Sequence, residues 1–302
     1  MKKSILIAGG TGFIGQNLTK RCLKNELSVT ILSTSKKKFP SKNIKFIKCD
    51  ISKKRELLNK LKKKKFDYVV NLAGYVDHSQ KIKTIKSHYN GCKNLADYFK
   101  TKKIKKFIQI GSSVEYGKIK SPQTENKIIQ EKKLKSHYGL AKLKSTNYLL
   151  NLNKFFFFPC TILRFFLVYG PGQLDNRLIP YVILNCLKNN SFKNSKGIQL
   201  RDFLFIDDAV NSIMKCLKNK KSNGHIINIC SGKPVKIKSI VLRINKIIKK
   251  GRPLFGKIKL RPDEPLKLYS NNRKARKFLN WMPKVSLNDG LNRTIKNYEK
   301  KF

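Results

Sequence analysis

The sequence predicts an α/β protein with a doubly wound parallel sheet and a smaller C-terminal α+β lobe. In the first half, short apolar runs alternate with longer amphipathic segments, and a glycine-rich turn follows the first run. This alternation becomes irregular after about Gly170. Short apolar runs separated by helices indicate parallel strands with helices on both faces of the sheet. The pattern is typical of the doubly wound architecture.

The strands expected in the first half are short apolar runs, at 4–8, 28–32, 44–49, 68–72, 107–110 and 160–168. The helices expected between them carry apolar residues at helical spacing, at 13–24, 55–63, 82–100 and 134–151. The two classes can be told apart because side chains repeat every two residues in a strand and about every 3.6 in a helix. Together these elements predict a first domain over residues 1–170.

The second half is organised differently. Helices are expected at 178–188, 207–217, 237–249 and 287–299, and a strand at 225–229. No internal repeat or long linker separates them. We therefore expect a substrate-binding lobe over residues 171–302, with strands from about 200–230 returning to the sheet of the first domain.

The formal net charge of +51 is carried by lysine, since 57 of the 68 basic residues are Lys and only 11 are Arg. Proteins that read nucleic acid rely on arginine to contact base edges. The lysines occur in every segment, which favours a compositional bias, and we expect no specific nucleic-acid partner. A nucleic-acid or anionic-membrane role is the alternative, and nonspecific binding to polyanions at low salt is expected in either case.

The cysteines and apolar runs predict a cytoplasmic protein. The seven cysteines include no C-x-x-C pair, which favours reduced thiols over disulfides or a metal site. The first apolar run, 5–8, is too short for a signal peptide. The longest, 155–163, stops at Arg164 and is too short for a bilayer span.

Three glycines, Gly9, Gly12 and Gly15, follow the first expected strand, and the third lies in the first turn of the first expected helix. The first two allow a tight turn and a close approach of the backbone to a pyrophosphate at the helix N-terminus, where N–H groups and the helix dipole favour an anion. Gly15 lets the helix pack closely on the sheet. This context predicts a Rossmann-type dinucleotide site that includes Phe13 and Ile14.

The end of the second expected strand indicates which dinucleotide binds. A carboxylate usually follows this strand and binds the ribose 2′-hydroxyl of NAD. This chain has Ser33, Thr34, Ser35 and Lys36 there instead. Hydroxyls and lysines suit a 2′-phosphate, so NADP(H) is favoured, with contact at Ser33, and NAD(H) is the alternative.

Together with further motifs along the chain, this dinucleotide site resembles that of the extended short-chain dehydrogenase/reductases. These form the NAD(P)-dependent epimerase/dehydratase family, which acts on nucleotide sugars. Among the matching segments are an S-x-x-x-Y-G motif and a Y-x-x-x-K motif. All of them follow the family's order, at 49–51, 71–74, 111–117, 138–142, 164–171, 199–203 and 261–262. The resemblance implies a nucleotide-sugar substrate, and a homodimer is compatible with it. It adds cofactor contacts after the third and fourth strands, at Asp50, Ile51, Leu72, Ala73 and Gly74.

The Y-x-x-x-K motif supplies the predicted catalytic pair. Tyr138 and Lys142 are four residues apart and share one helix face. A free tyrosine has a pKa of about 10, and a nearby ammonium and an oxidised nicotinamide would both favour its phenolate. Tyr138 could then act as a general acid or base. The resemblance adds Ser112, which bonds the same sugar oxygen, and gives Lys142 a second role in holding the nicotinamide ribose.

The resemblance also implies contacts to the substrate. Arg201 and Arg261 match arginines that bind the substrate diphosphate, and planar guanidinium groups suit phosphate oxygens. Arg177 is expected near the same diphosphate or the sugar, and Ser113 beside the sugar. Arginine is scarce in this chain, which favours a functional role for these positions over ordinary surface charge.

Departures from the family pattern narrow the reaction. Family dehydratases carry an acidic pair just after the serine, where this chain has Ser113 and Val114. Glu115 falls one place late for that role, and we expect its side chain to point away. Val114 and Arg177 stand where some members use Cys and His for epimerisation beside a keto group. His88 and Leu167 stand where the family often has Asn, and Leu167 disfavours the substrate pose of the UDP-galactose epimerases.

With dehydration and epimerisation beside a keto group disfavoured, the reaction that these residues still support is hydride transfer with one tyrosine as proton partner. The leading hypothesis is an NADPH-dependent 4-ketoreductase of a nucleotide-linked 4-keto-6-deoxyhexose, similar to enzymes of the CDP-abequose synthase type. The alternative is a 4-epimerase that keeps NAD bound, similar to UDP-glucose 4-epimerases. A third hypothesis is a noncatalytic NAD(P)- and RNA-binding protein, which the intact Ser112, Tyr138 and Lys142 disfavour.

Overall fold

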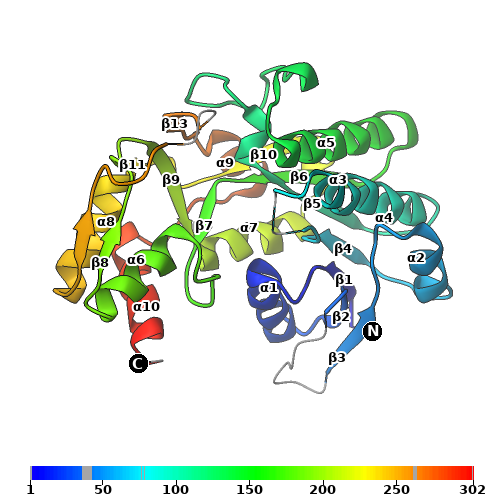
Figure 1. The fold of residues 1–302 in the computed structure, drawn as a ribbon. Coiled ribbons are helices and arrows are strands. Elements are labelled where there is room, and N and C mark those ends of the chain that lie inside the picture. The colour runs from blue at the N-terminus through cyan, green and yellow to red at the C-terminus, as the bar shows by residue number, and fades with distance from the viewer. Residues whose placement is uncertain (1, 36–42, 76, 78, 261–263, 301) are drawn as a thin grey trace.

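The computed structural model describes residues 2–35, 43–75, 77, 79–260, 264–300 and 302, and its centre is a seven-stranded sheet (Figure 1). The strand order is β10-β6-β5-β4-β1-β2-β3, and every neighbouring pair is parallel. Its strands are β1 (Ser4–Ala8), β2 (Ser28–Ser33), β3 (Ile44–Lys48), β4 (Tyr68–Asn71), β5 (Lys106–Ser112), β6 (Cys160–Phe165) and β10 (His225–Ile229). The predicted doubly wound parallel sheet is confirmed.

Helices cover both faces of this sheet (Figure 1). On β1, Ile5 and Ile7 share a core cluster with residues of α1 (Phe13–Lys24) and α7 (Ile206–Leu217). Leu6 and Ala8 share the other cluster with α2 (Lys54–Leu61), α4 (Gly91–Lys100) and α5 (His137–Phe156). Successive strand residues therefore face opposite helical layers, which is why β1 is apolar from Ile5 to Ala8 rather than alternating.

The segment expected to be one helix over 82–100 has three parts. A short helix, α3 (Lys81–Ile85), leads through a π-helical turn (Lys86–Asn90) into α4. A π turn inserts one extra residue per turn and is frequent at functional sites. The apolar spacing alone predicts the helix and carries no signal for the inserted residue.

The helix α5 starts and ends later than the predicted 134–151. Its N-cap is Ser136, whose hydroxyl accepts a hydrogen bond from the Gly139 N–H at 3.2 Å. A serine in that position satisfies a backbone donor that the helix leaves free, so the helix begins at His137. It continues through Phe156 and ends where Phe157 adopts a left-handed conformation.

The predicted strand 160–168 is wrong as a single element. It divides at Phe166 into β6, in the large sheet, and β7 (Leu167–Tyr169), which pairs with β9 (Leu200–Phe205) in a second sheet. Consequently only β10 from the 200–230 region joins the large sheet. The second sheet is completed by β11 (Pro234–Lys236) and β13 (Lys267–Leu268), and β8 (Ser191–Lys193) pairs with β12 (Arg252–Leu254).

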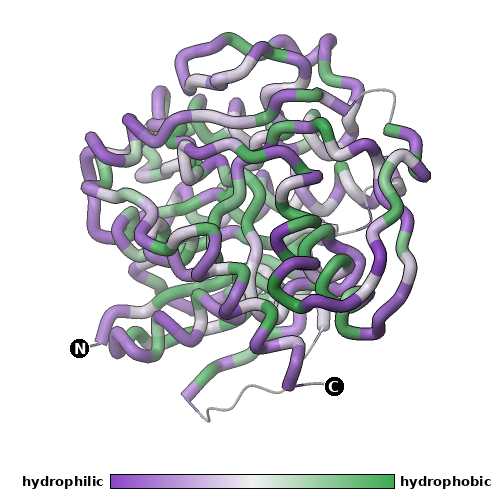
Figure 2. Tube along the Cα trace, turned by 90° about the vertical axis from the view of Figure 1, so that its left-hand side faces the viewer, coloured by the Kyte–Doolittle hydropathy of each residue, from purple (hydrophilic) through white to green (hydrophobic). Residues whose placement is uncertain are grey.

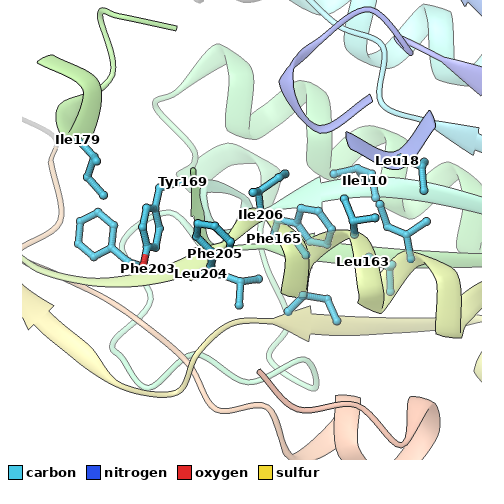
Figure 3. Close-up of a cluster of buried hydrophobic side chains, with 14 of the residues drawn as sticks. Leu18, Ile110, Leu163, Phe165, Tyr169, Ile179, Phe203, Leu204, Phe205 and Ile206 are labelled. Atoms are coloured by element: carbon cyan, nitrogen blue, oxygen red, sulfur yellow. The ribbon is translucent and has the colours of Figure 1, made fainter. Parts of the chain in front are cut away.

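One hydrophobic core joins the two sheets. Figure 3 shows a row of buried side chains that runs from Tyr169 and Phe203, in the second sheet, to Phe165 and Ile110 in the large one. The other helices of this half are α6 (Leu178–Leu187), α8 (Ile237–Ile248), α9 (Arg273–Leu279) and α10 (Leu287–Glu299), and the 3-10 turns are Ser113–Tyr116, Glu131–Lys133 and Lys220–Ser222. In Figure 2 the hydrophobic stretches of the chain gather in the interior.

All seven cysteines are free and buried. In the part of the chain that the structure describes, no helix is both long and apolar enough to cross a bilayer. No group of three or more His, Cys, Asp or Glu side chains within those same residues could hold a metal ion.

Candidate active site

The predicted site lies at the carboxyl ends of β1, β4 and β5. These strands are neighbours in the sheet, and β1 leads into a helix on one face while β4 leads toward helices on the other. Such a reversal of direction opens a crevice at the strand ends, where α/β proteins bind ligands. The glycine turn, the Ser112 turn and the start of α5 all come to this edge.

The glycine turn leaves no room for side chains at Gly9 and Gly15. Gly9 has a φ of +79°, and a Cβ built there would lie 2.7 Å from the Ala73 nitrogen. A Cβ on Gly15 would lie 2.3 Å from the Gly9 carbonyl oxygen. The first glycine therefore provides a left-handed turn and the third a close approach of α1 to that turn.

Gly12 differs because the space around it is open. It is the N-cap of α1 and has no side-chain capping bond. A Cβ built on Gly12 would meet only the Gly9 carbonyl oxygen, at 3.4 Å, among the described atoms. The first turn of α1, with half-buried Phe13 and Ile14, thus presents backbone donors to an open cradle. These residues fit the pyrophosphate of a dinucleotide.

The residues expected near the adenosine end surround the tips of β2 and β3. Ser33 is half-buried, and its hydroxyl is 2.7 Å from that of Thr11. Asp50 accepts hydrogen bonds from the Ser52 N–H and hydroxyl, both on Oδ1. Ile51 is buried. Lys36, which we expected to favour a 2′-phosphate, lies outside the described residues.

The segment after β4 forms the opposite wall. The Ala73 N–H donates to Asn71 Oδ1 at 3.2 Å, and Leu72 and Ala73 are half-buried. At Gly74 a Cβ would lie 1.8 Å from the His88 ring, so this position also requires glycine. The sequence predicted Gly74 from resemblance alone, and the structure supplies its steric reason.

The three predicted catalytic residues come together at this edge. Ser112 ends β5, while Tyr138 and Lys142 lie on one face of α5. The Lys142 Nζ atom is 5.8 Å from the centroid of the Tyr138 ring and donates to the Ile110 carbonyl oxygen at 2.7 Å. That hydrogen bond fixes a buried ammonium beside the phenol.

The environment keeps the Tyr138 phenol protonated. Burial raises its pKa to about 12, a hydrogen bond with the Ser112 side chain opposes this shift, Glu115 adds to it, and the Arg177 charge lowers it. The His88 ring meets the Tyr138 ring edge-on, at 4.9 Å between centroids. We expected a phenolate promoted by an ammonium and an oxidised nicotinamide. The protein alone shifts the pKa of Tyr138 in the other direction, because burial disfavours the charged form.

Burial also lowers the pKa of the Lys142 ammonium, and this shift is opposed by the nearby Glu115 carboxylate. The proton on the Lys142 ammonium is thus more easily lost than that of an exposed lysine. Its hydrogen bond to the Ile110 carbonyl oxygen uses one of the three ammonium donors.

Glu115 organises the site, a role that the sequence analysis missed. Its Oε1 accepts from the Ser112 N–H at 2.7 Å, and its Oε2 accepts from the Thr146 hydroxyl at 2.8 Å and from the Arg164 Nη2 at 2.7 Å. Glu115 therefore ties the Ser112 turn to α5 and β6. Ser112 and Glu115 form a capping box, and the S-x-x-E spacing is the sequence signal that could have revealed it.

Gly139 allows α5 to approach this turn. A Cβ on Gly139 would lie 2.8 Å from the Val114 carbonyl oxygen. The glycine between Tyr138 and Lys142 therefore sets the distance between the helix and Ser112, a contact that the motif spacing does not predict.

The residues predicted to bind the substrate differ in their exposure to solvent and in their partners. Arg177 is exposed at the N-cap of α6, close enough to Tyr138 to lower its pKa. Arg201 is buried and pairs with Glu264 at 2.7 Å. Ser113 is buried in the turn after Ser112. Arg261 lies outside the described residues.

Comparison with known proteins agrees with this geometry. Residues 5–230 match the model of the NAD dependent epimerase/dehydratase family. A putative UDP-glucose 4-epimerase of Methanocaldococcus jannaschii is 28% identical, over 96% of this chain and 97% of that protein. The CDP-abequose synthase of Salmonella typhimurium is 32% identical over 43% of this chain and 45% of its own length.

A solved structure gives the same result for the fold. The UDP-glucuronic acid 4-epimerase of Bacillus cereus, in complex with UDP-glucuronic acid and NAD, superposes with a TM-score of 0.86. The two chains are 28% identical, and the match covers 99% of this chain and 100% of the epimerase.

Proposed function

The chain belongs to the NAD dependent epimerase/dehydratase family, and from that membership we propose that it transfers hydride at C4 of a nucleotide-linked sugar, with Tyr138 as the proton partner. The observation that carries this proposal is the placement of the Tyr138 phenol beside Lys142 on α5, at the edge of the sheet where Ser112 ends β5. A protonated phenol is a proton donor.

Each catalytic residue has a separate task in this proposal. The Tyr138 phenol donates its proton to the C4 oxygen when the keto group is reduced, and the Ser112 hydroxyl hydrogen-bonds the same oxygen. Lys142, held by the Ile110 carbonyl oxygen, keeps a positive charge near the phenol and stabilises the phenolate that is left. When bound, the nicotinamide supplies the hydride to C4. The glycine turn, with Asp50 and residues 72–74, holds the dinucleotide.

The turn after Ser112, residues 113–116, disfavours a reaction that eliminates water from the sugar. Dehydration needs an acid and a base beside the sugar, whereas Ser113 and Val114 carry neither. Glu115 is the nearest carboxylate in sequence, but it is fully buried and bonded to Ser112, Thr146 and Arg164. Because these bonds occupy both carboxyl oxygens and hold the side chain in place, Glu115 is unsuited to proton transfer with a substrate.

We assign substrate binding to the C-terminal lobe. Arg177 is exposed near Tyr138 and suits the sugar or the diphosphate. Arg201 suits the diphosphate, and Glu264 holds its guanidinium in the structure described here. A diphosphate would compete with Glu264 for the Arg201 Nη2 donor, because both offer negatively charged oxygens as acceptors.

A 4-ketoreductase of a nucleotide-linked 4-keto-6-deoxyhexose is the leading form of this proposal. The Tyr138 phenol carries the proton that reduction of a keto group consumes. The end of β2 offers the hydroxyls of Ser33, Thr34 and Ser35 and no carboxylate, which suits NADPH. The partial similarity to CDP-abequose synthase is compatible with this reaction.

A 4-epimerase is the second candidate, and the comparisons favour it. Both the full-length relative from Methanocaldococcus jannaschii and the Bacillus cereus structure carry the name of a 4-epimerase, and the latter holds NAD. In that reaction Tyr138 would first accept and then return a proton.

The dinucleotide that copurifies with the protein separates the two reactions. The purified protein is denatured, and the released cofactor is identified and quantified by mass spectrometry. A 4-ketoreductase is expected to release NADP(H), or to exchange its cofactor readily. If one NAD per chain is retained through purification, the 4-epimerase reaction is favoured and the 4-ketoreductase reaction is abandoned.

A further inference from the structure

Three consecutive phenylalanines stand exposed at the end of α5. The exposed fractions of Phe155, Phe156 and Phe157, which we call the aromatic tip, are 64%, 56% and 88%. The next residue, Phe158, is buried and packs against Phe107, with 5.3 Å between the ring centroids. The tip is therefore fixed at its base by the core while its own rings face solvent.

The backbone conformation at Phe157 is also unfavourable for a residue with a side chain. Phe157 ends α5 in the left-handed conformation, with a φ of +51°. Glycine is the usual residue at this place in a helix, because a Cβ is strained there. The chain thus keeps an exposed aromatic ring at a position where a Cβ costs the folded backbone some free energy.

Two lysines contact the rings of the tip, and two more follow the end of the neighbouring helix α4. The Lys100 ammonium lies 4.0 Å from the centroid of the Phe156 ring, and that of Lys154 lies 5.2 Å from the centroid of the Phe155 ring. Lys102 and Lys103, which follow α4, are also exposed. We call these four residues the lysine collar. Aromatic rings flanked by lysines are typical of segments that lie in the interface of an anionic membrane.

We propose that the aromatic tip inserts into the surface of a bilayer that contains anionic phospholipids, and that the lysine collar binds the headgroups. The aliphatic stems of the lysines can follow the rings while their ammonium groups stay at headgroup level. Apolar burial and charge attraction act together, as reversible membrane anchoring usually requires two signals. The net charge of +51 gives attraction of the same sign over the whole molecule.

The geometry favours a bilayer over a nucleic acid. Single-stranded nucleic acids are held in grooves where bases stack on aromatic faces. Phe157 is 88% exposed, so it stands clear of the surface and has no second wall to enclose a base.

Vesicle cosedimentation tests the proposal without any use of catalysis, so its outcome is independent of the proposed reaction. Vesicles of phosphatidylcholine alone are compared with vesicles of equal parts phosphatidylcholine and phosphatidylglycerol. We expect the wild-type protein to bind the second kind. Phe157→Gly should reduce its partitioning about tenfold, because one ring no longer leaves water. Its thermal stability should not fall, since glycine suits the left-handed backbone.

Matched control variants distinguish binding through the aromatic tip from nonspecific apolar adsorption and from attraction by the total charge. Ile128→Ser removes another exposed apolar side chain, 90% exposed, and should leave binding unchanged. Lys100→Gln with Lys154→Gln should weaken binding more than Lys246→Gln with Lys250→Gln. Lys246 is on α8 and Lys250 follows it closely, and α8 lies far from α4 and α5 in Figure 1.

Two results would overturn the proposal. In one, Phe157→Gly and the wild type bind anionic vesicles equally, so that binding depends on total charge alone. In the other, Phe156→Ser changes the oligomeric state in analytical ultracentrifugation without changing vesicle binding. The tip would then be a contact with a second copy of the chain.

Discussion

Glu115 and Arg164 form an enclosed ion pair below the catalytic turn, with 2.7 Å between Oε2 and Nη2, and their side chains are 0% and 1% exposed. Arg164 also lies over the Tyr116 ring, 4.4 Å from its centroid. A buried ion pair contributes little net stability against apolar residues, but loss of one partner leaves a buried charge alone. Here Glu115 also accepts a hydrogen bond from the Ser112 N–H, so the ion pair helps to hold the backbone of the catalytic turn in place.

The pair can be tested by a double-mutant cycle. Arg164→Met leaves the Glu115 carboxylate buried without its cation and should lower the free energy of unfolding by about 3–5 kcal/mol. Combining it with Glu115→Gln should cost clearly less than the sum of the two single changes, because no charge is then stranded. Urea unfolding measures all four proteins. Additive losses would mean that the pair is not coupled.

The glycine turn gives a paired prediction on stability and binding. Gly15→Ala places a methyl group 2.3 Å from the Gly9 carbonyl oxygen and should lower both the melting temperature and dinucleotide affinity. Gly12→Ala meets only one atom, at 3.4 Å, and should reduce affinity while the melting temperature changes little. Thermal unfolding and calorimetric titration with NADPH and NAD check this. Unchanged affinity in Gly12→Ala would place the pyrophosphate elsewhere.

The Arg201–Glu264 pair predicts opposite effects on substrate affinity. Glu264→Gln weakens the hold on the guanidinium and should lower the KM for a nucleotide-linked sugar, with kcat nearly unchanged. Arg201→Met should raise the KM by at least tenfold, because a charge-assisted bidentate contact is lost. Steady-state kinetics measures both. If Arg201→Met left the KM unchanged, the diphosphate would have to bind at another arginine.

The pKa of Tyr138 predicts a loss of stability in alkali. The value is raised from 10.0 to about 12 in the folded chain, so folding binds this proton more tightly. That stability is complete below the unfolded pKa and is lost as the pH rises toward the folded one. From about pH 9 to about pH 11 the wild type should lose about 1 kcal/mol relative to Tyr138→Phe. Urea unfolding of both proteins at the two pH values tests the sign, and an unchanged difference contradicts the shift.

The sequence predicted the elements that depend on periodic burial. The strand over 4–8 and the helices over 13–24 and 287–299 agree with the structure residue for residue, since their apolar spacing is regular and glycine, serine or loop residues end them. The split at Phe166 was missed because β6 and β7 are both apolar, and only pairing with β9 separates them. Periodicity carries no information about which sheet a strand joins.

Within the site, motif spacing predicted Tyr138 and Lys142 on one helix face, and the resemblance placed Ser112 beside them. The tertiary supports were not predictable in this way. Glu115 was considered only as a misplaced dehydratase acid, because its partners Thr146 and Arg164 are distant in sequence. The need for glycine at 74 and 139 likewise depends on contacts with His88 and Val114 that only the folded chain reveals.

In the proposed reaction, Tyr138 gives a proton to a sugar oxygen during hydride transfer. The most direct measurement follows the oxidation of NADPH by the wild type, Tyr138→Phe and Tyr148→Phe, each mixed with nucleotide-linked 4-keto-6-deoxyhexoses. Tyr148 is the control, since it lies on the same helix and its hydroxyl bonds Asp97 instead. We predict turnover by the wild type and by Tyr148→Phe, and a loss of about 10²- to 10⁴-fold in Tyr138→Phe. Equal rates in all three proteins would contradict the claim.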